Sequence, residues 1–213
     1  MYAGAKFSSA VQPPEMLCKL DAAGVDEFGA YWAPERDKNS ELWRKIKPMQ
    51  SPHGTFVVRT FRTGEDGQPI DAAFLPYELV TASAGIDLWS VGILTYELVT
   101  GDTLVQSNRD DDFSSGSEMS CIAMWGDEKM DQKLQEKMDQ KLQAVPDRAA
   151  RDLIQTLLQP DPSDRGTADD ALKHRFFHPE SGETGGGGDG GAAADDEALV
   201  GVSNIVAHQD WLP

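Results

Sequence analysis

An apolar run with one acid near its start is the feature that most constrains this chain. Between Ile86 and Val99, nine of fourteen residues are apolar, and they fall on every side of a helix. Fourteen residues is long for a strand, and Gly101 follows as a stop signal. The run therefore predicts a helix over 86–99 that is buried all round. Asp87 lies inside it, and a buried carboxylate needs hydrogen-bond donors.

Two more helices are predicted near the end of this helical part. Residues 147–158 predict a helix that Pro160 and Pro162 end. One face of it is apolar: Ala150, Leu153, Ile154, Leu157 and Leu158. The next helix starts at Thr167, which forms a capping-box-like pattern with Asp170. Three basic residues are expected in its last turn, where the helix dipole favours positive charge: Lys173, His174 and Arg175.

Residues 18–80 show a less regular pattern. A helical stretch is predicted to open at Pro34 and Glu35 and to close at Pro48. Residues 55–61 are rich in β-branched and aromatic side chains and predict a short strand. The chain is thus expected to be mostly helical, with one irregular region.

An eight-residue unit occurs twice without change over residues 128–143. Its apolar residues recur every four positions, which predicts an amphipathic helix: Met130, Leu134, Met138 and Leu142. A period of eight turns the apolar stripe by about 80° per repeat, too much for a coiled-coil seam. A local duplication that lengthened one surface helix is favoured over a dimerisation device.

Charge and composition exclude several classes of partner. The formal charge is −17, whereas nucleic-acid binding needs a basic footprint. No apolar run approaches the roughly 20 residues that span a bilayer, and the first residues lack the apolar core of a signal peptide. The two cysteines, Cys18 and Cys121, support neither a disulfide framework nor a zinc site. We expect a cytoplasmic protein with a protein partner, and the oligomeric state stays open.

Residues 179–213 are predicted to form a flexible acidic tail. They hold seven acids, no Lys or Arg, and a glycine-rich tract at 185–191. Such a tract has no side chains to bury and loses much backbone entropy on ordering. A short docking element near the end is the less favoured alternative, built on Ile205, Val206, Trp211 and Leu212.

Three segments, in this order, resemble the C-terminal lobe of eukaryotic protein kinases of the Ser/Thr type: residues 7–17, 86–101 and 150–177. Residues 13–15 (Pro-Pro-Glu) are similar to the Ala-Pro-Glu motif that ends the family's activation segment. Residues 87–92 (Asp-Leu-Trp-Ser-Val-Gly) are similar to the start of its central helix. Residues 161–165 (Asp-Pro-Ser-Asp-Arg) are similar to its Asp-Pro-x-x-Arg link, and a His-x-Phe-Phe ending follows.

The resemblance implies a mainly α fold, a partial kinase C-terminal lobe over residues 1–178 with a small irregular or β insertion at 18–80. Glu15 would pair with Arg165, since an Arg fork and a carboxylate can bond bidentately. Asp87 would hold backbone N–H groups of the catalytic loop. Judged from the residues alone, Glu15 could be an ordinary solvent-exposed acid at a helix start, and this alternative stays open.

Further residues take roles only through the resemblance. Ser8 and Ser9 would lie at the substrate, although a plain loop serine remains an even alternative for Ser8. Pro14, Trp89 and Gly92 would complete the structural motifs.

One departure from the family is the 72-residue separation of Glu15 and Asp87, which implies an insertion of several dozen residues. Residues 33–35 (Ala-Pro-Glu) follow 26–29 (Asp-Glu-Phe-Gly), which imitates the family's metal-binding motif. We reject that pair, because four or five residues cannot form an activation segment.

The sequence of 213 residues lacks the motifs that a protein kinase needs for catalysis. Phosphoryl transfer needs a Gly-rich phosphate cover, a strand Lys, a catalytic-loop Asp with its Asn, and a metal-holding Asp. No catalytic or metal-binding residue is therefore assigned, and ATP and Mg²⁺ are expected only for a full-length parent that phosphorylates protein Ser or Thr. The chain is either a fragment or degenerate paralogue of such a kinase, inactive alone, or a non-catalytic interaction module derived from a kinase lobe.

Overall fold

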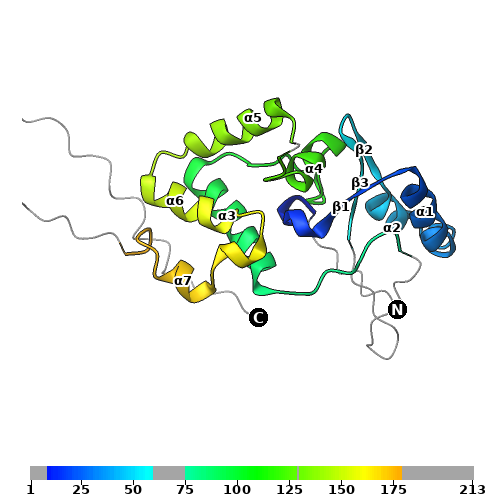
Figure 1. The fold of residues 1–213 in the computed structure, drawn as a ribbon, viewed down its shortest axis with the longest axis horizontal. Coiled ribbons are helices and arrows are strands. Elements are labelled where there is room, and N and C mark those ends of the chain that lie inside the picture. The colour runs from blue at the N-terminus through cyan, green and yellow to red at the C-terminus, as the bar shows by residue number, and fades with distance from the viewer. Residues whose placement is uncertain (1–8, 60–74, 129, 179–213) are drawn as a thin grey trace, which may run out of the picture. The chain divides into compact units, whose positions relative to one another are not determined.

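The computed structural model describes residues 9–59, 75–128 and 130–178 (Figure 1). Every described residue belongs to one unit of the chain, Met1–Pro179. The predicted tail at 179–213 lies outside the described residues. Within this unit the fold is mainly helical, as predicted, with one small antiparallel sheet.

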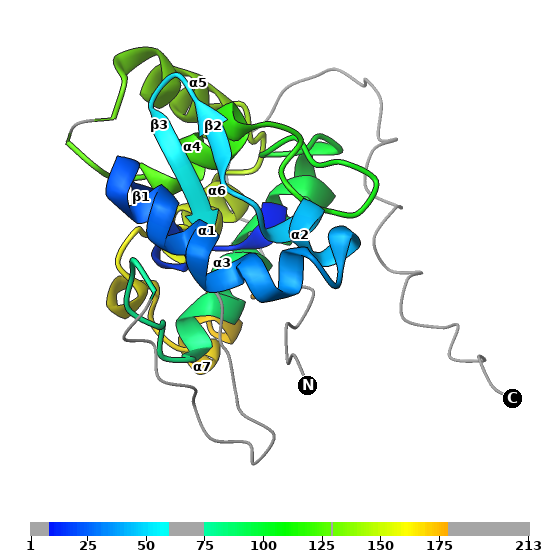
Figure 2. The same cartoon turned by 90° about the vertical axis from the view of Figure 1, so that its right-hand side faces the viewer.

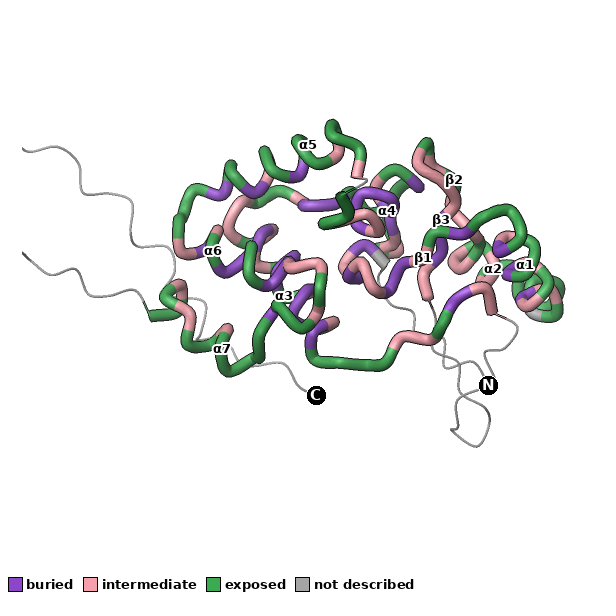
Figure 3. The backbone as a smooth tube through the Cα atoms, in the orientation of Figure 1, coloured by how far each residue is buried: buried purple, intermediate pink, exposed green. Residues whose placement is uncertain are grey.

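Helix α3 (Ala84–Thr100) is the predicted central helix, and Gly101 ends it in a left-handed conformation, with φ 70°. One side is buried, with Trp89 and Ile93 at the centre of the main core. The prediction that it is buried all round is wrong, because Val91, Leu94 and Leu98 are 43%, 51% and 85% exposed. Buried and exposed positions therefore alternate along α3 (Figure 3).

Helix α6 (Arg148–Leu157) packs beside α3 (Figure 1) and confirms the second predicted helix. The Asp147 carboxylate caps it by accepting a hydrogen bond from the Ala150 N–H at 2.6 Å. Gly92 of α3 lets the two helices approach closely. A Cβ there would lie 2.8 Å from Leu158 Cδ2 and 3.0 Å from Leu157 Cβ.

After α6 come a short 3-10 turn, η3 (Pro162–Arg165), and helix α7 (Ala168–Leu172). The predicted capping box between Thr167 and Asp170 is present. The helix is shorter than expected, so the three basic residues lie beyond its last turn and not within it. Two of them, His174 and Arg175, instead contact the Asp152 carboxylate of α6 at 3.3 and 3.0 Å.

The duplicated unit forms α5 (Gln132–Gln143) only in part. The second copy packs on the core through Met138 and Leu142, which are 3% and 8% exposed. Met130 of the first copy precedes the helix, and Leu134 is half-buried. Two identical sequences thus take unequal environments, because Met138 and Leu142 are buried in the main core whereas Met130 and Leu134 only pack against its edge.

Residues 18–80 are irregular only in part: residues 18–59 carry helices and strands, whereas residues 75–80 form neither. Strands β1 (Leu17–Leu20), β2 (Met49–Ser51) and β3 (Gly54–Val58) form an antiparallel sheet in the order β1-β3-β2. The sheet lies between α4 (Gly116–Ala123) on one side and α1 (Ala22–Arg36) with α2 (Ser40–Ile46) on the other (Figures 1 and 2). The strand predicted at 55–61 is β3, and residues 60 and 61 lie outside the described part.

The two helices of this region differ from the predicted one. Helix α1 was not foreseen, and Pro34 lies inside its last turn instead of opening a helix. Asn39 begins α2 by accepting the Leu42 N–H at 2.9 Å. Phe28 and Trp32 of α1 pack with Val57 of the sheet in a second hydrophobic cluster.

Candidate functional site

Segment 9–16 forms two 3-10 turns, η1 (Ser9–Val11) and η2 (Pro14–Met16), and η1 contacts α3. Proline suits the first position of such a turn, because its φ is fixed and it needs no N–H partner there. Of the expected substrate-side serines, Ser8 lies outside the described residues, and Ser9 begins η1. Glu15 lies in η2.

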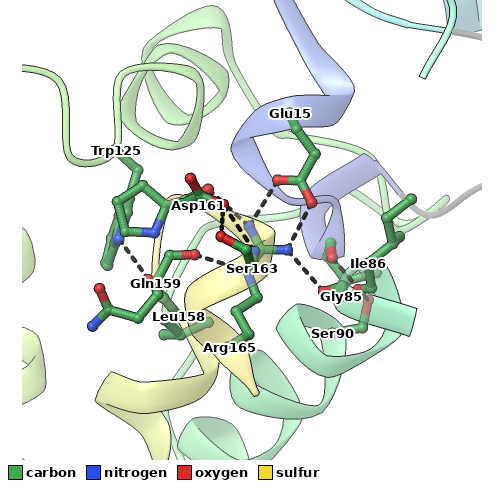
Figure 4. A network of polar contacts seen from close by, with 12 residues as sticks. Glu15, Gly85, Ile86, Ser90, Trp125, Leu158, Gln159, Asp161, Ser163 and Arg165 are labelled. Carbon is green, nitrogen blue, oxygen red and sulfur yellow. Dashed lines mark hydrogen bonds and ion pairs between the residues drawn. The ribbon is translucent and has the colours of Figure 1, made fainter. Parts of the chain in front are cut away.

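The Glu15 carboxylate meets the guanidinium of Arg165 in a bidentate pair (Figure 4). Both N···O distances are 2.7 Å. The Arg165 side chain has no exposed surface, and that of Glu15 is 19% exposed. The structure thus brings together residues that lie 150 positions apart in the sequence.

Every N–H of the Arg165 guanidinium has an acceptor. Besides Glu15, it donates to the carbonyl oxygens of Gln159 at 2.7 Å, Gly85 at 2.8 Å and Pro160 at 3.0 Å. A buried charge is stable only when it is paired and its donors are satisfied. Arg165 consequently joins η2, the start of α3 and the turn after α6 in one node.

Two indole rings border this node. The guanidinium carbon of Arg165 lies 5.0 Å from the ring centre of Trp89, within cation–π range. Trp125 meets Trp89 edge-on, with ring centres 5.6 Å apart and planes at 86°. Trp89, an expected motif residue, is therefore central to the node, whereas sequence reasoning did not single out Trp125.

Gly85 is a further residue that the sequence did not mark as functional. A Cβ there would lie 2.9 Å from Pro162 Cβ and 3.2 Å from the Pro162 carbonyl oxygen. The missing side chain lets η3 approach α3, and the Gly85 carbonyl then reaches Arg165. A backbone carbonyl cannot be recognised from the residue type. The sequence signal for this contact is therefore limited to the glycine itself, which lies next to the motif at residues 87–92.

Asp87 lies in the first turn of α3, half-buried, where the helix dipole favours an acid. No described residue donates a hydrogen bond to its carboxylate. The expected role toward a catalytic loop therefore stays a prediction.

Segment 9–16 is held at two more points. The Ser90 hydroxyl of α3 donates to the Val11 carbonyl at 3.1 Å, and the Ala10 N–H donates to the Asp111 carbonyl at 3.2 Å. Ser90 lies inside the kinase-like motif at residues 87–92, but the sequence does not indicate its hydrogen bond to Val11. These bonds fix η1 independently of Glu15.

A cavity of about 350 Å³ opens beside η1. Apolar and polar side chains line it together: Ala10, Val11, Ser90, Leu94, Glu97, Val105, Ser107 and Asp111. Burial, and secondarily the Asp111 charge, raise the pKa of Glu97. The cavity thus combines apolar walls with two carboxylates, which suits a cationic group on an aliphatic stem.

No group of three or more metal-ligating side chains occurs within the part of the chain that the structure describes. No helix of that part is long and apolar enough to cross a bilayer.

A helical lobe whose buried Arg fastens a Pro-Pro-Glu turn to a central helix defines the class of fold. The sequence profile described as "Protein kinase domain" matches residues 70–177, just over half of the chain. The chain therefore belongs to the protein kinase family, and its fold is a partial kinase C-terminal lobe. Asp87, Trp89, Gly92 and Arg165 lie within the matched residues, whereas Pro14 and Glu15 precede them.

Two curated proteins are similar to part of this chain. "Serine/threonine-protein kinase 17A" of Oryctolagus cuniculus is 31% identical over 96 residues, which cover 45% of this chain and 20% of that protein. "Calcium/calmodulin-dependent protein kinase cmkA" of Emericella nidulans is 31% identical over 100 residues, with the same coverage. The chain thus matches about a fifth of the length of these relatives.

Proposed function

We propose that this chain forms the helical, substrate-facing part of a Ser/Thr protein kinase. The whole protein would transfer the γ-phosphoryl group of ATP, with Mg²⁺, to Ser or Thr of a protein substrate. The Glu15–Arg165 pair carries the proposal, because it fastens segment 9–16 against α3, the place where the resemblance puts the substrate. The printed names of the two similar proteins support the same reaction class.

The 213 residues would not transfer phosphate by themselves. Their sequence offers no phosphate cover, no catalytic-loop Asp and no metal-holding Asp, and positioning with charge stabilisation supplies most of the rate in this reaction. Their part would be to hold the protein substrate. Two free cysteines, Cys18 and Cys121, favour a reducing compartment such as the cytoplasm.

The cavity beside η1 would receive a basic side chain of the substrate. Its apolar walls fit the aliphatic stem of Lys or Arg, and Glu97 with Asp111 would face the positive charge. A Ser-containing peptide with a basic residue should therefore bind better than its acidic counterpart.

Two measurements test these statements on the purified chain. ATP with Mg²⁺ should give no thermal shift and no labelled product above a buffer control, and clear ATP-dependent labelling would overturn the inactivity. In fluorescence anisotropy, a Ser-containing Lys/Arg peptide should bind, and Glu97→Gln or Asp111→Asn should weaken it several-fold. Asp169→Asn, on exposed α7, is the matched control, and equal binding of basic and acidic peptides would contradict the docking role.

A non-catalytic interaction module is the second candidate. The uncovered apolar strip of Val91, Leu94 and Leu98 on α3 favours it, because such a strip suits a stable partner. Sequencing the full-length transcript separates the two. An in-frame catalytic loop upstream supports the kinase, whereas a stop codon directly upstream supports the module.

A further inference from the structure

The geometry points to Trp125 as the positioning residue of the Glu15–Arg165 pair. We propose that its indole N–H fixes the carbonyl turn that receives Arg165, and so sets how firmly segment 9–16 is held. The functional meaning of that segment rests on the proposed function, but the positioning itself rests only on the contacts.

The first contact is a hydrogen bond across 33 residues. Trp125 lies in the turn after α4, and its Nε1–H donates to the Leu158 carbonyl at 2.9 Å (Figure 4). Leu158 is the residue that ends α6. The next two carbonyls, of Gln159 and Pro160, are acceptors for Arg165. The indole therefore holds the backbone immediately before the Arg165 acceptors.

The second contact is between the indole rings of Trp125 and Trp89. Trp125 meets Trp89 nearly perpendicularly, and Trp89 in turn lies against the Arg165 guanidinium. Trp89 is completely buried, so its ring has little room to move if Trp125 stays in place. Trp125 thus supports Arg165 from the ring side as well as from the carbonyl side.

The third contact is made by the backbone next to the indole. Gly126 has φ 75°, and a Cβ on it would clash with the Pro160 ring. The chain at 125–126 consequently packs directly on Pro160, whose carbonyl accepts from Arg165 Nη2. A glycine is needed there both for its conformation and for this close approach.

The three contacts make Trp125 a support that acts through other residues. If its N–H is lost, the turn at 158–160 is free to shift, and the angles at two of the Arg165 donors deteriorate. Hydrogen bonds weaken steeply with misalignment, so the bidentate hold on Glu15 should loosen. The effect should concentrate at segment 9–16 and be smaller in helix α1, which has no contact with the Arg165 node.

Hydrogen exchange on the full chain, read peptide by peptide, tests the proposal. Two substitutions remove the N–H: Trp125→Phe, and an analogue at position 125 in which sulfur replaces the ring N–H and the ring shape is kept. Protection of amides in residues 10–17 should fall about tenfold, the effect of one lost hydrogen bond. Trp43→Phe, in the second hydrophobic cluster, is the matched control and should lower protection at residues 10–17 no more than in α1.

Each outcome decides the matter. Protection at 10–17 within about twofold of the unchanged chain in the sulfur analogue overturns the proposal, even if Trp125→Phe fails to fold. An equal loss of protection at 10–17 and in α1 would show general destabilisation and would also overturn it. Basic-peptide binding is scored separately, so failure of the proposed function leaves the exchange result interpretable.

Discussion

Arg165 carries a full positive charge in a place with no exposed surface, and it is stable there because one carboxylate and three carbonyls share its five N–H groups. A lysine cannot replace such a fork, since it offers three donors from a single point. The same reasoning makes the node sensitive from either end: removing Glu15 leaves a buried charge without a counter-ion.

Replacing Arg165 by alanine should lower the free energy of unfolding by more than about 2 kcal/mol, toward the roughly 3–5 kcal/mol typical of a broken buried pair. Glu15→Gln should have a smaller effect of the same sign, because it keeps one acceptor. Urea denaturation measures both. A loss below about 0.5 kcal/mol for Arg165→Ala would mean that the pair behaves like a surface ion pair.

Glu97 should make the stability of the fold depend on pH, with lower stability at higher pH. Burial first, then the Asp111 charge, raise the pKa of Glu97, so the folded state holds the proton more tightly than the unfolded state. Its contribution to stability is full below the ordinary carboxyl pKa and is lost as the pH rises through the raised value.

Accordingly, Glu97→Gln should stabilise the fold at neutral pH, and the difference should vanish in acid. Thermal melts of both chains across that range provide the measurement. A Gln variant that is less stable at neutral pH would refute the argument.

At the scale of elements, the two copies of the duplicated unit give a comparison in which local sequence is held constant. Leu142 and Leu134 have identical preceding neighbours, yet only Leu142 is buried. The second copy is also fastened by polar contacts. Lys137 pairs with Glu118 at 2.9 Å, and Lys141 donates to the carbonyls of Thr103 and Leu104 at 2.7 and 2.8 Å.

Leu142→Ala should therefore cost about 2–5 kcal/mol, the range for a buried leucine, and Leu134→Ala about 1 kcal/mol or less. Chemical denaturation of the two variants in parallel checks this. Equal losses would show that the first copy is packed as tightly as the second.

Elements with their own periodic signal could be predicted from the sequence. Helix α6 shows its buried face and its Asp cap locally, and the capping box of α7 is readable in the same way. Helix α4 carries a local signal as well: Ser115 caps it, and Glu118 follows three residues later.

Helix α1 could not be read so easily. Glycines at 24 and 29 and Pro34 obscure its pattern, and its buried side is defined by a sheet that the sequence does not reveal. That sheet pairs Leu17 with Val58, forty-one positions further along, and no local pattern specifies such a pairing. At the site, the residue-type motif predicted Glu15 and Arg165 together, whereas the carbonyl acceptors and Trp125 follow only from the packed turn.

For the whole molecule, the exposed apolar side of α3 predicts how the chain should behave in solution. Val91, Leu94 and Leu98 follow the helical repeat and form one apolar strip. We expect concentration-dependent self-association of the chain in sedimentation velocity, reduced by Leu98→Glu with little change in stability. Leu172→Glu, at an isolated exposed leucine of α7, is the control. A chain that stays monomeric at tens of micromolar would contradict this.

The small sheet faces a different hydrophobic cluster on each side. Leu17 and Phe56 point to the main cluster, whereas Leu20 and Val57, on the same two strands, point to the smaller one. The two clusters thus share a wall, and neither can melt without exposing apolar side chains of the other. Helices α1 and α2 and the helices that match the kinase profile should therefore unfold as one cooperative unit, with calorimetric and van't Hoff enthalpies that agree. A substitution at Trp32 that opens the second cluster should therefore lower the melting temperature of α3 and α6 together with that of α1.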